Sequence, residues 1–503
     1  MLVTRRLDAH HDAERAFVHI YGESESAFWL DSAMAGPHGR FSFVGDASGP
    51  RGAVVTYDVG AGRVRIERDG GVELRDESIF DHLRREQRRP SVPSTDLPFD
   101  FDCGFAGYLG YELKADCDGD AAHRSPLPDA ALVFADRLIA FDHLEGQTWL
   151  LCLAEPEGAA AAERWLDETA LRLASLPPLP EPAPPVRGEP LDFRLRRPRE
   201  RYLDDIAACR RRLVAGETYE ACLTNKVVAE LAVDSLSLYR SLRRANPAPF
   251  GAFLRFGDVA VLSSSPERFL RVGRDRWAES RPIKGTSRRA GGAAEDAELA
   301  ARLAADSKSR AENVTIVDLV RNDLGVVCEP GSVQVPELMR VETYETVHQL
   351  VSTVRGRLRE GLAAPECVRA CFPPGSMTGA PKKRTMEILD ELEGEARGPY
   401  SGAIGWLGLG GGCDLSVAIR TIVADGASIE IGAGGAIVLD SDPEQEHEEM
   451  LLKAAAPIAA IDPSADLPST FDAAAGGGFR PKEHRRSYRQ MANSGPADGE
   501  YDV

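Results

Sequence analysis

The sequence lacks long apolar runs and any excess of positive charge. No stretch approaches the roughly 18 apolar residues that a membrane-spanning helix requires, and the opening residues MLVTRRLDAHHDAERAF contain no apolar core of a secretory signal. The formal net charge is −19 at pH 7. This charge excludes the clustered basic surface of a nucleic-acid-binding protein and also argues against docking on anionic lipid. We therefore expect an enzyme that binds neither nucleic acid nor membrane.

Disulfide, zinc and nucleotide-binding patterns are missing as well. The nine cysteines form no Cys-x-x-Cys pair, and the ten histidines form no zinc-binding spacing. Cysteines in apolar surroundings, such as Cys152 in WLLCLA, are expected to be buried, reduced thiols. The glycine-rich segments at 375–382, 408–413 and 432–437 do not have the spacing of phosphate-binding loops. Reduced thiols predict a cytoplasmic location.

A proline-rich segment divides the chain, whose 503 residues suggest two to three domains. Half of the residues in PPLPEPAPPVRGEP (177–190) are proline, which excludes a helix or a central strand and predicts an extended linker. The linker separates an N-terminal subregion, residues 1–176, from a catalytic region, residues 191–462. Residues 463–503 are rich in Gly, Ala, Ser and Pro and are expected to be a disordered tail.

Strand-like and helical segments are mixed in both regions. In the first, the strand-like runs AFVHIYG, GAVVTYDV, RVRIER and ALVFADRLIAFDH alternate with turn signals. The second combines strand-like runs such as FGAFLRFG and SIEIGA with three long helical stretches, and further helices are expected at 157–176 and 197–217. The pattern predicts an α+β fold rather than a regular βαβ alternation.

The segment DSDPEQEHEEMLLKAAAP predicts a helix with an acidic face. Asp442 is a candidate N-cap and Pro443 occupies the first helical position. At helical spacing, one face carries Glu446, Glu449 and Lys453. Such a face is either a solvated, salt-bridged surface or a cation site.

A further acid favours the cation site. Glu312 lies in SRAENVTIVDLVRNDLG, just ahead of an apolar helix. Hard oxygen ligands with open positions suit Mg²⁺, which keeps waters and shares its other positions with substrate oxygens.

Three other segments could bind a carboxylate. The loop CFPPGSMTGAPKK, which contains Thr378, opens directly into a helix whose N–H groups would face the loop. Arg420 is expected in a strand whose other face is apolar, where a charge usually pairs with a partner or a ligand. Tyr400 is expected at the start of another strand. Each of these residues could equally be structural.

Lys284, in RPIKGTSRR, can be interpreted in two ways. It is either a surface lysine in a turn or an amine held in a pocket as a nucleophile. Taken alone, the segment favours the surface lysine.

Eight motifs resemble those of the chorismate-utilising enzymes and occur in the same order. They are SPERFL, RPIKGTSRR, AENVTIVDLVRNDLG, VHQLVSTVRG, PPGSMTGAPKKRTMEIL, YSGAIGWL, DLSVAIRT and SDPEQEHEEMLLKA. The resemblance covers about residues 193–458, and SAFWLDSAM and GRFSFVGDASGP are similar to the opening strands of the aminating members. It implies a large antiparallel β-sandwich flanked by helices, the anthranilate synthase component I-like fold.

Within the family, Lys284 indicates the reaction. Anthranilate synthases typically have alanine at this position, whereas PIKGT is typical of aminodeoxychorismate synthase component I. Isochorismate-type enzymes carry a water-activating lysine at the position of Glu220, so a hydrolytic reaction would lack its base here. The resemblance therefore implies that chorismate and ammonia are converted to 4-amino-4-deoxychorismate, a precursor of p-aminobenzoate for folate or for a secondary metabolite.

The resemblance also implies roles for individual residues. Glu267 would be the general acid for the leaving hydroxyl, Lys284 the nucleophile and His348 an orienting residue near the ring. The amine of Lys284 must be neutral, so we expect burial, Mg²⁺ and the nearby Arg281 to lower its pKa. The implied Mg²⁺ ligands are Glu312, Glu446 and Glu449. The implied substrate-binding residues are Gly285, Thr286, Thr378, Tyr400, Arg420, Gly434, Gly435 and Lys453; the family's third glycine in this run is Ala436 here.

The implied reaction needs a source of ammonia, and two other functions compete with it. No Gly-x-Cys-x-Gly nucleophile elbow occurs, which implies a glutamine amidotransferase partner. One alternative is an anthranilate synthase component I. Another is a catalytically silent subunit that binds tryptophan, since WLDSA and NPAPFGAF resemble the walls of a tryptophan pocket. That pocket would contain Asp31, Ser32, Pro249 and Phe250. The chain retains nearly all catalytic positions, which argues against a silent subunit.

Overall fold

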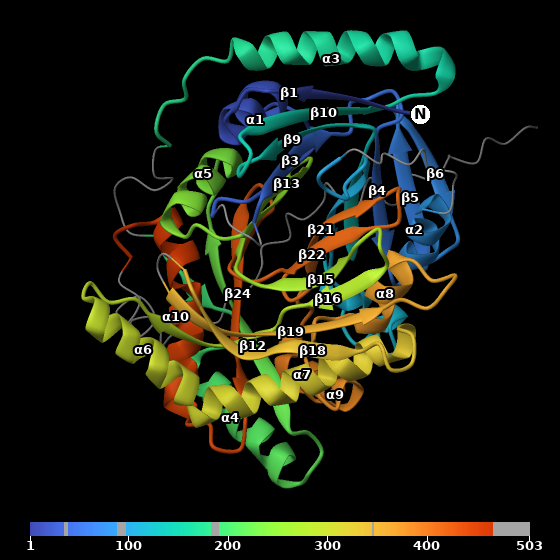
Figure 1. The fold of residues 1–503 in the computed structure, drawn as a ribbon. Helices are drawn as coiled ribbons and strands as arrows, with labels where there is room; N and C mark the ends of the chain where they lie inside the picture. The colour runs from blue at the N-terminus through green and yellow to red at the C-terminus, as the bar shows by residue number, and fades with distance from the viewer. Residues whose placement is uncertain (35–38, 88–96, 183–190, 345–346, 466–503) are drawn as a thin grey trace, which may run out of the picture.

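The computed structural model describes residues 1–34, 39–87, 97–182, 191–344 and 347–465. Within these residues, strands form two 12-stranded sheets, and ten α-helices accompany them (Figure 1). Every strand pairing among named strands is antiparallel. The predicted α+β class is confirmed. Most of the expected tail and part of the expected linker lie outside the described residues.

The first sheet has the N-terminal strand at one edge. In spatial order it consists of β1 (Leu2–Leu7), β10 (Gln147–Leu153), β9 (Arg137–Asp142), β3 (Phe41–Asp46), β2 (Ser26–Asp31), β13 (Phe250–Phe256), β14 (Val259–Ser265), β23 (Thr421–Ala424), β24 (Ser428–Ile437), β12 (Glu220–Glu230) and β11 (Arg194–Leu195), with β20 (Gly379–Ala380) paired to β12.

The second sheet contains the strand that carries Lys284 at one edge. Its order is β17 (Ile283–Arg288), β19 (Val347–Arg357), β16 (Trp277–Ser280), β15 (Arg268–Val272), β22 (Cys413–Val417), β21 (Ala403–Gly408), β7 (Gly104–Leu109), β8 (Ala130–Ala135), β4 (Ala53–Asp58), β5 (Arg63–Arg68) and β6 (Gly71–Arg75), with β18 (Gln334–Thr343) paired to β19.

The helices lie mainly on the outer faces of the sheets (Figure 1). They are α1 (Ala13–Tyr21), α2 (Ile79–Gln87), α3 (Ala159–Ala174), α4 (Arg199–Val214), α5 (Ser235–Ala245), α6 (Ala293–Ala305), α7 (Ser307–Val327), α8 (Ala364–Cys371), α9 (Lys382–Glu393) and α10 (Pro443–Ile461). Short 3₁₀ helices span Tyr111–Asp116, Pro156–Gly158 and Gly375–Met377. None of the described helices has both the length and the apolarity to cross a bilayer.

Both sheets combine strands from before and after residues 177–190. In the first sheet β2 pairs with β13, and in the second β7 pairs with β21. The proline-rich segment therefore divides the sequence but not the sheets. The two parts of the chain share their hydrogen-bonded backbone and do not form separate sheets.

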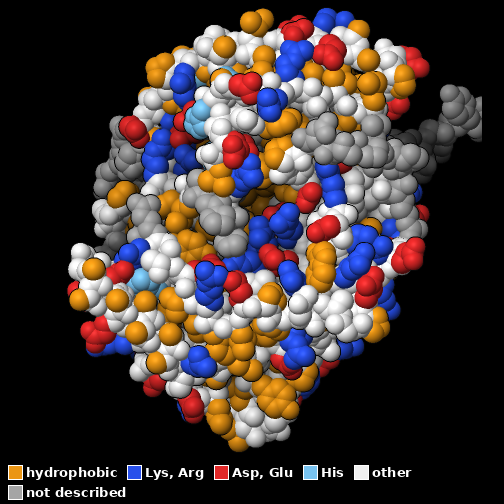
Figure 2. All heavy atoms as spheres, in the orientation of Figure 1, with side chains coloured by type: hydrophobic (Ala, Val, Ile, Leu, Met, Phe, Trp, Pro, Cys, Tyr) orange, Lys and Arg blue, Asp and Glu red, His pale blue; other side chains and the backbone are white. Residues whose placement is uncertain are grey.

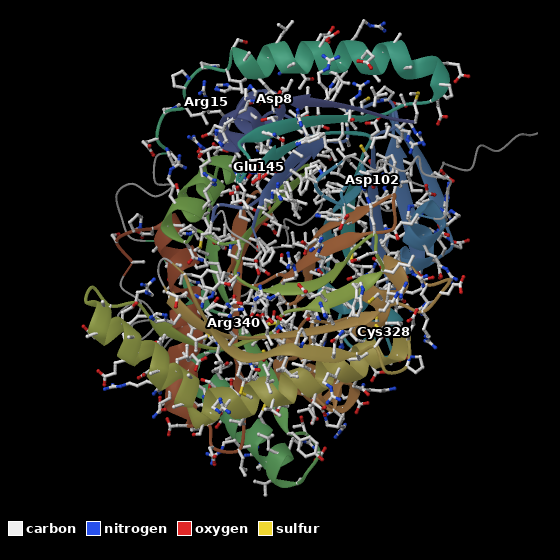
Figure 3. All side chains as sticks on the ribbon, in the orientation of Figure 1. Asp8, Arg15, Asp102, Glu145, Cys328 and Arg340 are labelled. Carbon is white, nitrogen blue, oxygen red and sulfur yellow. The ribbon has the colours of Figure 1, made fainter. Side chains whose placement is uncertain are left out.

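Apolar side chains fill the space between the sheets and beneath the helices (Figure 3). The central cluster joins Phe28 of the first sheet to Trp406 of the second, and Phe101 stacks on Trp406 with ring centroids 5.0 Å apart. Two further clusters lie on the outer faces, one under α1, α4, α5 and α10 and the other under α2, α7 and α8. This is the sandwich flanked by helices that the resemblance implies.

One expected strand is a helix instead. The run AFVHIYG lies in α1, because the carboxylate of Asp12 accepts a hydrogen bond from the Arg15 backbone N–H (2.9 Å) and caps the helix. Ala13, Phe17 and Tyr21 recur every four residues and are buried together. The prediction of a strand was therefore wrong, since the capping residue lies just before the apolar run.

Candidate active site

Lys284 is placed by an irregularity in β17. The register of its pairing with β19 shifts between Ile283 and Thr286, and such a bulge re-aims the side chains within it. The next residue, Gly285, has a φ of 91°. A Cβ atom there would lie 2.7 Å from the side chain of Ser309, so only glycine lets β17 pass this close to α7. The bulge and the glycine together turn the Lys284 side chain into the interior.

The amine of Lys284 is paired with a carboxylate of the other sheet. Its Nζ lies 2.6 Å from Oε1 of Glu220 in β12, and the two residues are 9% and 1% exposed. Burial favours the neutral amine, but the carboxylates of Glu220 and Glu312 outweigh it and raise the pKa of Lys284. The expected lowering of this pKa is wrong for the protein without ligands. Arg281, which we expected to lower this pKa, is ion-paired with Glu342.

Glu267 lies in the turn between β14 and β15, close to Lys284. Its carboxyl group is buried, and this burial raises its pKa to about 7 despite the positive charge of Lys284. The backbone carbonyl of Glu267 accepts a hydrogen bond from the Val417 N–H (3.0 Å), which fixes the turn. A carboxyl group that keeps its proton near neutral pH can act as a general acid.

The three predicted metal ligands lie on two facing helices. Glu312 belongs to α7, whereas Glu446 and Glu449 belong to α10, whose N-terminus begins at Asp442 and Pro443 as predicted. Burial raises the pKa of Glu312. For Glu449 burial acts in the same direction, but the charge of Lys453 outweighs it and holds the pKa below its usual value.

Two lysines neutralise these acids. Lys308 at the start of α7 lies 2.7 Å from Oε1 of Glu446 and 3.8 Å from Oε1 of Glu312, and Lys453 lies 2.8 Å from Oε1 of Glu449. Among the described residues, no three acidic, histidine or cysteine side chains converge in a preformed metal cluster. The sequence left a salt-bridged face and a cation site as alternatives. Glu446 and Glu449 form the salt bridges, and they are also the side chains that a cation site would use.

The donor set nevertheless fits Mg²⁺. All three side chains offer carboxylate oxygens, the ligands that Mg²⁺ prefers. Oε2 of Glu446 is buried and has no hydrogen-bond partner among the described residues. A buried carboxylate oxygen without a partner is costly unless a cation or a donor binds it. The ammonium group of Lys308 lies between Glu312 and Glu446.

Arg420 supplies a positive charge without an anion. It lies in the connection between β22 and β23, with a φ of 52°, and not in a strand as expected. Its guanidinium donates a hydrogen bond to the Lys453 carbonyl (3.0 Å), and no carboxylate forms an ion pair with it within the described part of the chain. Burial lowers the pKa of Arg420. A largely buried cation of this kind favours an anionic ligand.

The predicted aromatic and glycine residues lie near this group. The ring of Tyr400 packs so tightly on β24 that a Cβ atom at Gly432 would lie 2.1 Å from it. The Gly434 carbonyl accepts a hydrogen bond from Nζ of Lys453 (2.9 Å). A Cβ atom at Gly435 would lie 3.3 Å from the unpartnered oxygen of Glu446. The glycine run therefore forms the strand surface beneath Lys453 and Glu446.

Two predicted residues have other partners in this structure. Thr378 is fully buried, and its hydroxyl donates to the Gly375 carbonyl (3.1 Å), so it holds its own loop. His348 is 2% exposed, with Nδ1 2.9 Å from the Thr343 hydroxyl and Nε2 3.0 Å from Asp296. Both ring nitrogens are engaged, and the histidine ties β19 to β18 and α6. Their roles toward a substrate remain predictions, as does that of the exposed Thr286.

The four residues of the expected tryptophan pocket do line one cavity. It has a volume of about 320 Å³ and includes Asp31, Ser32, Pro249 and Phe250. The carboxylate of Asp31 already accepts a hydrogen bond from Arg243 (2.8 Å) and a second from the hydroxyl of Tyr239 (3.2 Å). The group that would bind an amino-acid ammonium is thus satisfied internally.

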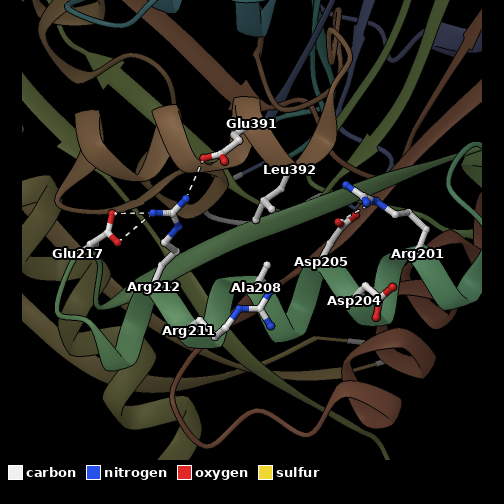
Figure 4. A pocket seen from close by; sticks show the side chains of 9 residues that line it. All are labelled: Arg201, Asp204, Asp205, Ala208, Arg211, Arg212, Glu217, Glu391 and Leu392. Atoms are coloured by element: carbon white, nitrogen blue, oxygen red, sulfur yellow. Dashed lines mark hydrogen bonds and ion pairs between the residues drawn. The ribbon is translucent and has the colours of Figure 1, made fainter.

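A larger hollow lies elsewhere on the surface, and none of the predicted site residues line it. It measures about 630 Å³ between α4 and α9 (Figure 4). Several of its charges form ordinary ion pairs, with Arg212 3.0 Å from both Glu217 and Glu391 and Arg201 3.0 Å from Asp205. On the face shown in Figure 2, a hollow near the centre is bordered by basic and acidic side chains.

Sequence reasoning missed two members of the site. The sequence identifies Glu220 only as the residue that replaces a lysine of the isochorismate-type enzymes, and it does not single out Lys308. No local pattern identifies either residue, because each acquires its role from a partner far away in the chain: Glu220 from Lys284, and Lys308 from Glu446.

Comparison with known proteins defines the class to which this fold and site belong. Residues 46–459 match the family model of the chorismate binding enzymes, and the chain belongs to this family. The crystal structure of anthranilate synthase component I from Streptococcus pneumoniae superimposes with a TM-score of 0.71 and 30% sequence identity, over 83% of this chain and 92% of that one. The predicted anthranilate synthase component I-like fold is confirmed.

Two curated relatives differ in their reactions. The aminodeoxychorismate synthase of Streptomyces pristinaespiralis is 52% identical over 90% of this chain, and the anthranilate synthase component 1 of Streptomyces coelicolor is 36% identical over 89%. The chain spans 64% of the length of the former and 86% of the latter. It is therefore more similar to the aminodeoxychorismate synthase, of which it covers less than two thirds.

Proposed function

We propose that this chain catalyses the amination half of an aminodeoxychorismate synthase, converting chorismate and ammonia to 4-amino-4-deoxychorismate. One observation carries the proposal: the buried amine of Lys284 lies close to the buried acid Glu267 and to the carboxylate of Glu312 on α7. An anthranilate synthase typically has alanine at the position of Lys284. The greater similarity to an aminodeoxychorismate synthase supports the same choice.

The residues divide the reaction into two substitutions. Lys284 attacks ring carbon 2 while the hydroxyl on carbon 4 leaves with the proton of Glu267, and ammonia then attacks carbon 4 and releases the lysine. Covalent catalysis replaces one difficult displacement by two easier ones. The burial of Glu267 keeps its proton available near neutral pH.

The substrate carboxylates meet fixed positive charges. Arg420, which has no carboxylate partner among the described residues, and Lys453 bind them from one side, and Tyr400 closes the site against β24. Glu312, Glu446 and Glu449 would hold Mg²⁺, which when bound neutralises a ring carboxylate and orients it. Binding of the cation requires Lys308 to leave the position between the carboxylates.

Ammonia comes from a glutamine amidotransferase, and the reaction takes place in the cytoplasm. The reduced state of the free cysteines supports this location. The product leads to p-aminobenzoate and folate or to a related secondary metabolite. The groups that perform the chemistry lie in residues 191–462, the proposed catalytic region.

Product analysis tests the proposal. The purified protein is incubated with chorismate, Mg²⁺ and ammonium salt, and with glutamine plus an added glutaminase. We expect 4-amino-4-deoxychorismate by mass spectrometry in both mixtures, and none from glutamine without glutaminase. Fluorescent anthranilate as the main product would assign the chain to the anthranilate synthases instead.

A further inference from the structure

The contact between Lys284 and Glu220 joins the two sheets inside the site. Lys284 extends from β17 of the second sheet to β12 of the first, and the 2.6 Å separation of Nζ and Oε1 is that of a short, charge-assisted hydrogen bond. Both residues are almost entirely buried. Bulk water therefore has little access to the proton that they share.

The position of Glu220 is fixed by its own backbone. It pairs with Ala380 of β20, and its carbonyl accepts a hydrogen bond from the Thr218 hydroxyl (2.9 Å). A Cβ atom at Gly379 would lie 1.9 Å from the same carbonyl, so β20 packs directly against it. The carboxylate is thus aimed at Lys284 by a rigid strand.

One oxygen of Glu220 has no assigned task. Oε1 accepts from Lys284, whereas Oε2 is buried and has no hydrogen-bond partner among the described residues. The carboxylate therefore keeps a free oxygen beside the one that contacts Lys284. It can become a neutral carboxylic acid without the loss of another hydrogen bond.

Lys284 requires such an acceptor. In the protein without substrate, the neighbouring carboxylates of Glu220 and Glu312 keep it as an ammonium ion, which has no lone pair for attack. Glu267 cannot take the proton, because its task is to give one to the leaving hydroxyl. Glu220 is the carboxylate in direct contact with the amine.

We propose that Glu220 positions Lys284 and accepts its proton when chorismate binds. This inference rests on the proposed function. The neutral amine forms a bond to carbon 2, the bond between carbon 4 and oxygen breaks, and the hydroxyl leaves as water with the proton of Glu267. Ammonia then bonds to carbon 4, and the bond between carbon 2 and Nζ breaks with its electron pair returning to nitrogen. Glu220 returns its proton to Lys284, and the new ammonium group reprotonates Glu267.

The transfer is favoured by the closing of the site. Substrate covers the pair and removes the remaining water, and two buried charges are costly in a medium of low polarity. A neutral amine beside a neutral acid avoids this cost. Lys284 therefore stays an ammonium ion until substrate binds, and substrate binding then converts it into the neutral nucleophile.

Replacement of Glu220 separates the two roles. Glu220→Gln keeps the shape and a hydrogen-bonding group but cannot take a proton, and we expect kcat to fall by about 10²- to 10⁴-fold, the usual contribution of a general base. KM for chorismate should change little. Glu220→Asp should restore part of kcat, and Glu217→Gln, which alters a half-buried, ion-paired acid on the same segment, is the matched control.

Two measurements report directly on Lys284. Mixing the enzyme with chorismate without ammonia and quenching rapidly should show the lysine adduct by intact-mass spectrometry, forming at least about 10²-fold more slowly in Glu220→Gln. Without substrate, labelling of Lys284 by acetic anhydride at neutral pH should be faster in Glu220→Gln, because burial then favours the neutral amine.

The outcomes distinguish this inference from the proposed function. Wild-type turnover together with wild-type kcat in Glu220→Gln would overturn the role of Glu220 and leave the proposed function intact. Unchanged labelling of Lys284 in the variant would overturn the positioning contact. A wild-type protein that forms no aminated product would overturn the proposed function, and this inference with it.

Discussion

Two buried side chains, Glu267 and Lys284, hold their protons for different physical reasons. Glu267 is protonated near neutral pH because burial disfavours its anion, whereas Lys284 is protonated because adjacent carboxylates stabilise its cation. An acid and a nucleophile can therefore coexist in one site before substrate arrives. The state of each follows from its neighbours rather than from its residue type.

The pKa of Glu267 predicts a pH dependence. A carboxyl group whose pKa is raised to about 7 is protonated below that pH and loses its proton as the pH rises through it. We expect kcat/KM for chorismate, measured at a constant concentration of free ammonia, to decrease above about pH 7. In Glu267→Gln activity should be low and this decrease should vanish. A rate that stays level from pH 6 to about 9 would contradict the assignment of Glu267 as the acid.

Lys308 predicts an effect on cation binding. Its ammonium group contacts Glu446 and Glu312, so a divalent cation must displace it. Because the lysine is partly exposed, the pair is worth at most about 1 kcal/mol, and Lys308→Met should tighten binding by up to roughly fivefold. Titration with Mn²⁺ followed by electron paramagnetic resonance measures this without turnover.

The control for this titration is Arg302→Met, which removes an exposed charge paired with Glu298 on α6. It should leave the affinity unchanged. Weaker binding in Lys308→Met than in the wild-type protein would show that Lys308 supports the cation instead of competing with it.

At the scale of elements, local chemistry was predictable and long-range geometry was not. The cap of α10 was found from Asp442 and Pro443, because capping depends on adjacent residues. The bulge that turns Lys284 inward depends on pairing with β19, and no local pattern indicates it. Arg420 was placed in a strand, although the chain turns there between β22 and β23. The motifs therefore identify the candidate site residues, whereas the contacts of these residues come only from the structure.

The cap of α10 predicts a measurable contribution to stability. The Asp442 carboxylate accepts a hydrogen bond from the Gln445 N–H (3.1 Å) at the helix N-terminus. Asp442→Ala should lower the free energy of unfolding by about 1 kcal/mol, and Asp442→Asn should retain most of it. Denaturant unfolding of the three proteins measures the difference. Equal stability of the alanine variant would show that other groups satisfy this end of the helix.

At the scale of the molecule, the two sheets are shared by both parts of the chain. Antiparallel strands, helices and an α+β class could be predicted from patterning and from the motifs. The order of the strands could not, because pairs such as β2 with β13 join segments more than 200 residues apart. The proline-rich segment resembles a domain boundary in the sequence, but strands from both sides of it pair within the same sheets.

This architecture predicts that the two parts cannot fold alone. Residues 1–176 and residues 191–503, expressed separately, should each lack a cooperative unfolding transition, since each would expose the unpaired edges of strands from both sheets. Expressed together, they should associate and recover a transition. A cooperative transition in either isolated fragment, followed by circular dichroism during heating, would contradict the shared architecture.

The central claim is that Lys284 is the nucleophile of an amination reaction. The most direct measurement is the product formed from chorismate, Mg²⁺ and ammonium by the wild-type protein and by Lys284→Ala, identified by liquid chromatography and mass spectrometry. The account predicts 4-amino-4-deoxychorismate from the wild-type protein and a loss of at least about 10²-fold in the variant. Equal formation of this product by both proteins would contradict it.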